Sequence, residues 1–135
     1  MAALSLTTAF SRYGAKLTNH QWAVSALSEN GELVISIWSH YLKPNDGKLR
    51  CTDKLSRWQH NKPGNNLLRE HLLRAVDEGL PVRMVIARTK ATTEIDAGAD
   101  ASSVPKTFGV REDLVGKVVS FDGDNFVIDF EKATS

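Results

Sequence analysis

One stretch of nine residues, 58–66, combines side chains of the kinds that contact nucleic acids. The indole of Trp58 can stack on a base, the Asn61 amide can hydrogen-bond to a base edge or to the backbone, and Lys62 can meet a phosphate. The stretch also leads into a predicted helix, whose free N-terminal amides attract phosphate. Structural roles are the alternative for single residues, with Trp58 in the core and Asn65 as a helix N-cap. Their combination makes this stretch the best candidate for a binding site.

Basic charge is concentrated in the same third of the chain. Residues 43–90 carry eleven basic and five acidic side chains, a net charge of +6, whereas residues 91–135 carry four basic and nine acidic ones, a net charge of −5. A basic segment that also holds aromatic residues is typical of surfaces that bind phosphates and bases. The alternative is a solvated face whose charge is met by the acidic C-terminal region. The sequence leaves both interpretations open.

We therefore expect a non-catalytic DNA-binding module with double-stranded DNA as its partner. Its expected contacts lie within residues 38–66 and comprise aromatic, cationic, imidazole and carboxamide side chains. They are Trp38, His40, Arg50, Arg57, Trp58, His60, Asn61, Lys62, Asn65 and Asn66. The alternative function is a self-associating or partner-binding protein, in which the acidic segment of one protomer meets the basic segment of another to form a homodimer.

Enzymatic interpretations have less support. Four residues follow the order of an HNH nuclease, namely His60, Asn61, Asn66 and His71. In such a nuclease one histidine activates water and another binds the metal. No β-hairpin is predicted before the helix, however, and Pro63-Gly64 interrupts the segment. Because the chain also lacks a Gly-rich phosphate loop and a Ser/His/Asp pattern of known spacing, we expect no catalytic residues, no metal site and no cofactor.

Length and composition predict a single globular domain over residues 1–135. The chain has 41% hydrophobic and 24% charged residues, close to the average for globular proteins. It has no run of about 18 apolar residues and no signal-peptide pattern, which predicts a cytoplasmic protein without a membrane partner. The one cysteine, Cys51, cannot form an internal disulfide, as is usual in a reducing compartment.

The elements that would position these residues begin with a β-hairpin. Residues 20–28 and 32–38 are β-prone runs joined by Asn30-Gly31, and both joining residues tolerate the positive φ of a type I′ turn. Apolar residues alternate along the second run, which predicts one core face. Trp38 ends this run and is either a packing residue or a ligand contact.

The middle of the chain is expected to hold one helix. Residues 39–62 predict a loop region with at most one short helix, because Pro, Asn, Asp and Gly follow one another there. From about residue 66 to 78, apolar residues recur at spacings of three and four, which predicts a helix with Asn65 as N-cap and Gly79 as a left-handed C-terminal residue. Residues 81–88 then predict a strand.

The C-terminal third is expected to hold a loop and a second hairpin. Residues 89–107 are rich in small and polar side chains and predict a flexible loop or flap. Strands at 114–121 and 125–130 are joined by Asp122-Gly123. Together the elements predict an α+β fold, with a small, largely antiparallel sheet of two β-hairpins and one further strand and with one main helix packed on one face.

Several features share their order and spacing with a known family. They are the stretch 10–17, the Gly31 turn leading into Ile35-Ser-Ile-Trp38, the helical run 66–75 with Gly79, and the strand 82–88. This pattern, which covers roughly residues 10–90, resembles the N-terminal domain of McrA-type restriction endonucleases. In that family the domain binds double-stranded DNA and reads modified cytosine, ahead of a separate HNH nuclease domain.

The resemblance implies a DNA surface that includes Trp38, which matches an aromatic position of the family. Where the family has an aromatic residue just before the helix, this chain has Asn65 or Asn66. A carboxamide offers hydrogen bonds but no apolar pocket for a methyl group, which argues against methyl reading. The chain ends where the nuclease domain of the family would begin. The resemblance therefore implies a reader without a nuclease, of a kind that a mobile gene cassette could carry.

Overall fold

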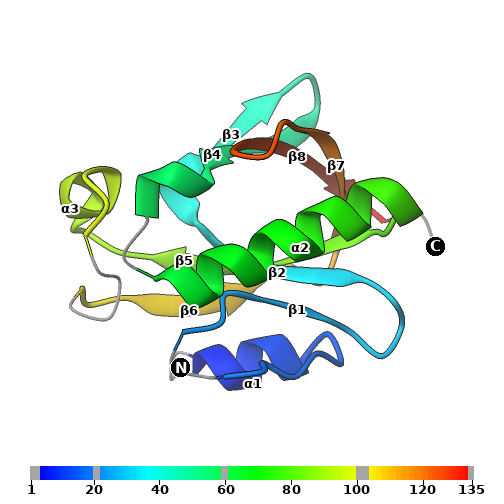
Figure 1. Ribbon diagram of the computed structural model, residues 1–135, viewed down its shortest axis with the longest axis horizontal. Helices are drawn as coiled ribbons and strands as arrows, with labels where there is room; N and C mark the ends of the chain where they lie inside the picture. The colour runs from blue at the N-terminus through cyan, green and yellow to red at the C-terminus, as the bar shows by residue number, and fades with distance from the viewer. Residues whose placement is uncertain (1–3, 20–21, 59–60, 100–103, 134–135) are drawn as a thin grey trace.

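The computed structural model describes residues 4–19, 22–58, 61–99 and 104–133. The fold is α+β, with eight strands and three α-helices among these residues (Figure 1). The helices are α1 (Leu6–Ser11), α2 (Lys62–Glu78) and α3 (Thr92–Asp96), with the 3-10 helices η1 (Ser39–Tyr41) and η2 (Leu55–Trp58). The strands are β1 (Ser25–Leu27), β2 (Leu33–Trp38), β3 (Leu42–Asn45), β4 (Lys48–Lys54), β5 (Val82–Arg88), β6 (Thr107–Val110), β7 (Leu114–Phe121) and β8 (Asn125–Lys132). No helix in the described part of the chain has the length and apolar character needed to cross a membrane.

The strands form one mixed sheet in the order β1-β2-β5-β7-β8-β4-β3, with β6 also paired to β5. Strands β2 and β5 run parallel, from Leu33 opposite Val82 to Trp38 opposite Ala87. The expectation of a largely antiparallel sheet is confirmed, because the other strand pairs are antiparallel. The sheet is larger than the small one expected, however, and its β2–β5 pair is parallel. The reason is the long crossover from β2 to β5, which includes α2 and brings the chain back to the same end of the sheet.

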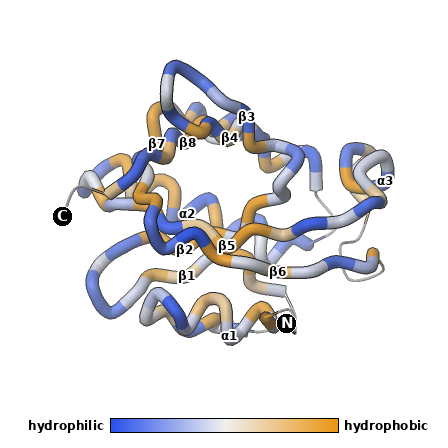
Figure 2. The backbone as a smooth tube through the Cα atoms, turned by 180° about the vertical axis from the view of Figure 1, so that it is seen from behind, coloured by the Kyte–Doolittle hydropathy of each residue, from blue (hydrophilic) through white to orange (hydrophobic). Residues whose placement is uncertain are grey.

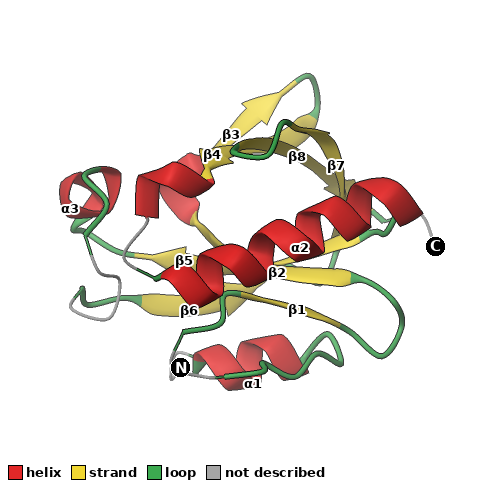
Figure 3. Ribbon diagram, viewed as in Figure 1, coloured by secondary structure: helices red, strands yellow, loops and turns green. Residues whose placement is uncertain are grey.

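Both faces of the parallel pair are buried. Ile35 and Met84 belong to the core cluster that includes the inner face of α2, whereas Val34 and Val85 pack in the cluster around Phe10 of α1. Figure 3 shows α2 crossing in front of the sheet and α1 lying below β1. Burial on both faces is typical of parallel strands. It holds the carboxyl ends of β2 and β5 in fixed positions.

The predicted hairpin of β1 and β2 is confirmed, but its turn differs from the expected type I′. Gly31 has a φ of 76°, whereas Asn30 has no positive φ. The Gly31 amide donates a hydrogen bond to the Ser28 carbonyl. A single left-handed residue at the end of this turn requires glycine only at that position.

A second hairpin, β3–β4, occupies much of the region 39–62, so the prediction of a loop there is wrong. Asp46, with a φ of 50°, and Gly47, with a φ of 78°, form the two-residue turn. Two consecutive positive φ angles are the signature of a type I′ turn. Strand β3 has only four residues and lies at the sheet edge, so it needs no apolar alternation. Its hydrophilic turn stands at the top of Figure 2.

Helix α2 begins at Lys62, earlier than the sequence predicts. Asn61 is the N-cap, and its side chain accepts a hydrogen bond from a backbone amide in the first turn at 3.1 Å. The predicted cap, Asn65, lies inside the helix, because Pro63 fits the first turn, where its missing N–H has no partner to lose. At the other end Gly79 has a φ of 65°, which confirms the predicted left-handed residue.

The segment expected to be a flexible loop, 89–107, contains helix α3 and leads into β6. Ile95 is 1% exposed and Val104 is 7% exposed, so this segment contributes two apolar side chains to the interior. The expectation of a loop throughout this segment is therefore wrong for α3. Its flexibility stays a prediction, and residues 100–103 lie outside the described part of the chain.

The predicted C-terminal hairpin of β7 and β8 is confirmed. Phe126, Ile128 and Phe130 share its buried face, as their alternation in the sequence predicts. Gly116 of β7 lies opposite Phe130, and a Cβ at Gly116 would overlap the Phe130 ring. This hairpin places the acidic C-terminal strand β8 directly beside β4.

The contact between His71 of α2 and Ser25 of β1 predicts a stability that depends on pH. Ser25 is fully buried, its Oγ lies 2.8 Å from His71 Nδ1, and burial lowers the pKa of His71. The folded state therefore binds this proton less readily than the unfolded state. The free energy of unfolding should fall as the pH decreases from about 6.5, the ordinary histidine value, through the lowered pKa.

Urea unfolding of the wild type and of His71→Gln, between about pH 8 and pH 5, measures this effect. The variant should lose part of the pH dependence, because glutamine does not titrate. The same slope in both proteins would assign the effect to other groups.

Candidate functional site

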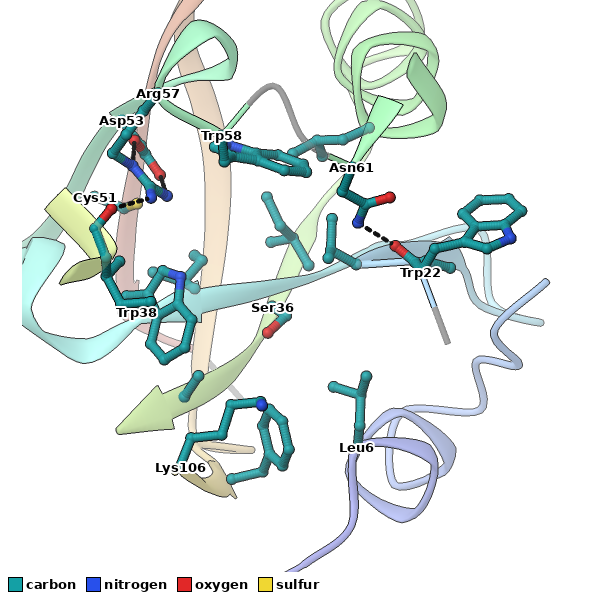
Figure 4. Close-up of a pocket in the computed structure, with 18 of the residues that line it drawn as sticks. Leu6, Trp22, Ser36, Trp38, Cys51, Asp53, Arg57, Trp58, Asn61 and Lys106 are labelled. Carbon is teal, nitrogen blue, oxygen red and sulfur yellow. Dashed lines mark hydrogen bonds and ion pairs between the residues drawn. The ribbon is translucent and has the colours of Figure 1, made fainter. Parts of the chain in front are cut away.

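A cavity of about 590 Å³ lies at the carboxyl ends of the parallel strands. This is the region of a parallel pair at which ligands commonly bind in α/β sheets. We call it the aromatic cavity. Its lining residues include Leu6, Trp22, Val24, Ser36, Ile37, Trp38, Cys51, Asp53, Arg57, Trp58, Asn61, Ala87, Ile95, Lys106 and Phe108 (Figure 4).

Two indole rings border the aromatic cavity. Trp38 and Trp58 line it from β2 and η2, whereas the ring of Trp22 points away from it (Figure 4). Trp38 and Trp58 are half-buried. Neither their indole N–H groups nor the Ser36 hydroxyl forms a hydrogen bond to a residue that the structure describes. The cavity thus combines flat apolar walls with a few available polar groups.

One wall of the aromatic cavity is an ion pair. The Arg57 guanidinium donates two hydrogen bonds of 2.7 Å to the Asp53 carboxylate, and both side chains are 11% exposed. A third hydrogen bond, of 3.0 Å, joins Arg57 Nη1 to the Ile95 carbonyl. Because the two charges are paired with good geometry, this wall presents little net charge to a ligand.

The same guanidinium connects the cavity wall to α3. Arg57 lies 4.8 Å from the centroid of the Tyr41 ring, and Tyr41 Oη donates to Asp96 at 2.6 Å. His40 Nε2 lies 2.9 Å from the same carboxylate oxygen. The hydrogen bond from Tyr41, followed by that from His40, lowers the pKa of Asp96, and burial raises the pKa of Tyr41. His40, a predicted DNA contact, is therefore engaged within the chain.

Two carboxamides fix the chain between η2 and α2. Asn61 Nδ2 donates to the Trp22 carbonyl at 2.7 Å, and Asn65 Nδ2 donates to the Leu55 carbonyl at 2.7 Å. Gly64 packs so closely that a Cβ there would overlap the Trp22 carbonyl. Asn61 and Asn65, which the sequence nominates as DNA contacts, thus hold backbone segments together.

A second hollow, of about 420 Å³, borders the same part of the chain. Its lining residues are Leu55, Ser56, Lys62, Asn65, Asn66, Arg69 and Asp124. Lys62 and Arg69 lie two turns apart on α2 and therefore on one side of the helix. We call this hollow the basic groove. The η2–α2 junction, residues 55–58 and 61–66, supplies side chains to both hollows.

The predicted contact residues fall into three groups. Those that line the aromatic cavity are Trp38, Arg57, Trp58 and Asn61. Those that line the basic groove are Lys62, Asn65 and Asn66. His40 and Arg50 line neither hollow, and His60 lies outside the described residues. The structure thus gathers the later part of the predicted set around the η2–α2 junction, and contact with DNA stays a prediction.

Part of the basic charge is neutralised by the acidic hairpin. Arg50 donates hydrogen bonds of 2.7 and 2.8 Å to Asp129, which lowers the pKa of Asp129, and Lys48 lies 3.9 Å from Glu131. Arg57, Arg74 and Arg83 also form ion pairs. The cations of residues 43–90 without an ion pair to a described residue are Lys43, Lys54, Lys62, Arg69, Arg88 and Lys90.

The sequence does not identify the other walls of the aromatic cavity. Leu6, Ser36 and Phe108 come from α1, β2 and β6, and no local pattern connects them. Two of these elements, α1 and β6, are not predicted at all. The presence of three tryptophans in a chain of 135 residues is a usable signal, but it does not show which rings share a cavity.

A β-hairpin, β3–β4, does precede α2, so the expectation that no hairpin lies before the helix is wrong. The described residues of the HNH order nevertheless have separate partners. Asn61 caps α2, Asn66 accepts a hydrogen bond from Arg69, and His71 contacts Ser25. Within the described part of the chain, no three His, Cys, Asp or Glu side chains are placed to hold a metal ion.

Comparisons with known proteins give no relative. No family model matches the chain, no curated protein is detectably similar to it, and no solved structure matches its fold. The resemblance to the N-terminal domain of McrA-type restriction endonucleases therefore stays a prediction, as does the mobile gene cassette.

The different roles of Asn65 and Asn66 predict different costs of substitution. Asn65 is 7% exposed and satisfies the Leu55 carbonyl, so Asn65→Ala should lower the free energy of unfolding by about 1 to 3 kcal/mol. Asn66 is exposed, and Asn66→Ala should change the free energy of unfolding by less than about 0.5 kcal/mol. Urea unfolding of the two variants measures both values. Equal small effects would mean that Asn65 does not hold the η2–α2 junction in place.

Proposed function

We propose that the protein is a non-catalytic DNA-binding module whose contact surface is the η2–α2 junction with its basic groove. The observation that carries this proposal is the content of the groove. Lys62 and Arg69 line it together with Asn66 and the carboxylate of Asp124, which accepts a hydrogen bond of 2.8 Å from the Ser56 hydroxyl. Neither cation has an ion pair with a described residue. Two cations and one carboxylate leave a net positive charge in the groove, which suits a phosphate.

Neighbouring groups extend this surface. Lys54 immediately precedes η2 and is exposed, so a third cation flanks the junction. The first turn of α2 adds the positive end of the helix dipole. Several phosphates of one DNA molecule can therefore be met by the same region. Contacts of this kind read the backbone and not the sequence, so duplex DNA of any sequence is the expected partner at low salt.

The alternative of an electrostatic homodimer has less support. It requires the acidic hairpin of one copy to meet the basic segment of another. Asp129 and Glu131 are paired with Arg50 and Lys48 of the same chain, so these charges already have partners. The homodimer stays a prediction without an assigned surface.

The groove predicts a specific change in salt dependence. The double variant Lys62→Ala/Arg69→Ala should bind duplex DNA more weakly than the wild type. Its slope of log affinity against log salt should be smaller by about 2, because two phosphate contacts are lost. Fluorescence anisotropy of a labelled duplex between about 50 and 200 mM salt measures the slope.

A matched control removes the same charges elsewhere. Lys48→Ala/Arg74→Ala also deletes one lysine and one arginine, but both side chains are in ion pairs away from the groove. It should keep a slope close to that of the wild type. Equal losses in the two double variants would show that only net charge matters. Absence of wild-type binding at about 10 μM protein in about 50 mM salt would remove the DNA-binding function itself.

A further inference from the structure

The proposed phosphate contacts lie in the basic groove, so they assign no ligand to the aromatic cavity. An anion is a poor candidate for it, because the Arg57 charge is already satisfied by Asp53. An anion would lose its hydration there without gaining that cation. The other lining groups include the rings of Trp38 and Trp58, the hydroxyl of Ser36, and Lys106, whose ammonium group donates to the Val104 carbonyl at 3.2 Å. Such a cavity favours a neutral, flat group with few hydrogen-bonding atoms.

We propose that the aromatic cavity receives one base that has rotated out of a DNA duplex, while the basic groove holds the neighbouring backbone. The inference rests on the proposed DNA-binding function and assigns a ligand class to a second site. A volume of about 590 Å³ lies within the range of pockets that hold small organic ligands, so a base and part of its sugar can enter. Proteins that take a base out of the stack hold it between aromatic or apolar side chains.

The lining groups provide stacking and a preference among bases. The rings of Trp38 and Trp58 offer flat faces, and every base can stack on such a face. An indole N–H can only donate a hydrogen bond, and the Ser36 hydroxyl can also donate. A base edge rich in acceptors suits this set, as in thymine with its two carbonyl oxygens.

The aromatic cavity and the basic groove adjoin one another as the base and the phosphate of one nucleotide do. Trp58 and Asn61 line the aromatic cavity, and the next residue, Lys62, lines the basic groove. A base and the phosphate attached to the same sugar therefore meet neighbouring residues of the η2–α2 junction. Hydrogen bonds of Asn61 and Asn65 hold this junction before any ligand arrives, which reduces the ordering cost of binding.

Three labelled duplexes of one sequence test the proposal by fluorescence anisotropy. The first is fully paired, the second has one thymine mispaired with thymine, and the third has an abasic site in place of that thymine. Rotating a base out of the stack costs least when it is mispaired, so the mismatched duplex should bind at least about tenfold more tightly than the paired one. The abasic duplex should lose this gain because it has no base to insert, although it is equally easy to bend.

Variants of the cavity separate base entry from general DNA binding. Trp58→Ala should abolish the preference for the mismatch, whereas Trp22→Ala, which removes a ring that points away from the cavity, should keep it. Because Trp58 also packs against the core, Ser36→Met provides a second test, in which a larger side chain occupies the cavity and both tryptophans stay. It should reduce the preference for the mismatched duplex at least about tenfold.

Each contrary result overturns base entry. Base entry is contradicted by equal affinity for the paired and mismatched duplexes, by an abasic duplex that binds as tightly as the mismatched one, or by an unchanged preference in Ser36→Met. Each of these three results would leave DNA binding intact. Binding of free thymidine that depends on Trp58, without a mismatch preference, would assign the cavity to free small molecules instead. Binding of none of the three duplexes would overturn the proposed function together with the inference.

Discussion

The site depends on one close contact, between the first turn of α2 and the backbone just before β1. Gly64 leaves no space for a Cβ against the Trp22 carbonyl, and the Asn61 side chain donates to that carbonyl at 2.7 Å while it caps the helix. The contact fixes where α2 begins. The start of the helix in turn directs Trp58 to the aromatic cavity and Lys62 to the basic groove. Pro63 is compatible with this position because the first turn of a helix needs no N–H from it.

The placement of acidic residues decides which cations remain for a ligand. Strand β4 lies beside β8, and along this pairing Arg50 and Lys48 meet Asp129 and Glu131. The chain then leaves the sheet at η2, where the Asp124 carboxylate accepts hydrogen bonds from the amide and the hydroxyl of Ser56. Lys62, which opens α2, makes no ion pair with any residue described in the structure. The same sheet register therefore stabilises one part of the basic segment internally and leaves another part, at the η2–α2 junction, for the proposed phosphate contacts.

The sequence predicts the elements whose turn residues and apolar spacing lie within one segment. It does not predict features that depend on packing between distant segments. The β7–β8 hairpin and the end of α2 at Gly79 follow from alternation and from turn residues. Strand β3 is too short and too exposed to show alternation, and the parallel pairing of β2 with β5 depends on a crossover that no local pattern reveals. The stretch 58–66 can be recognised as a candidate because its chemistry is contiguous. The aromatic cavity cannot, because its walls come from α1, β2, β4, η2 and β6.

The η2–α2 junction supplies side chains to two hollows, which we propose bind one nucleic acid together. Nitrogen-15 NMR spectra of the protein, titrated with the mismatched duplex, can follow both hollows at once, because each of the three tryptophans gives its own indole signal. The indole signals of Trp38 and Trp58 should shift together with the backbone amides of Lys62 and Asn66, while the Trp22 indole signal changes least. Shifts confined to the β3–β4 hairpin or to β8, with the Trp38 and Trp58 indoles unmoved, would show that DNA binds away from both hollows.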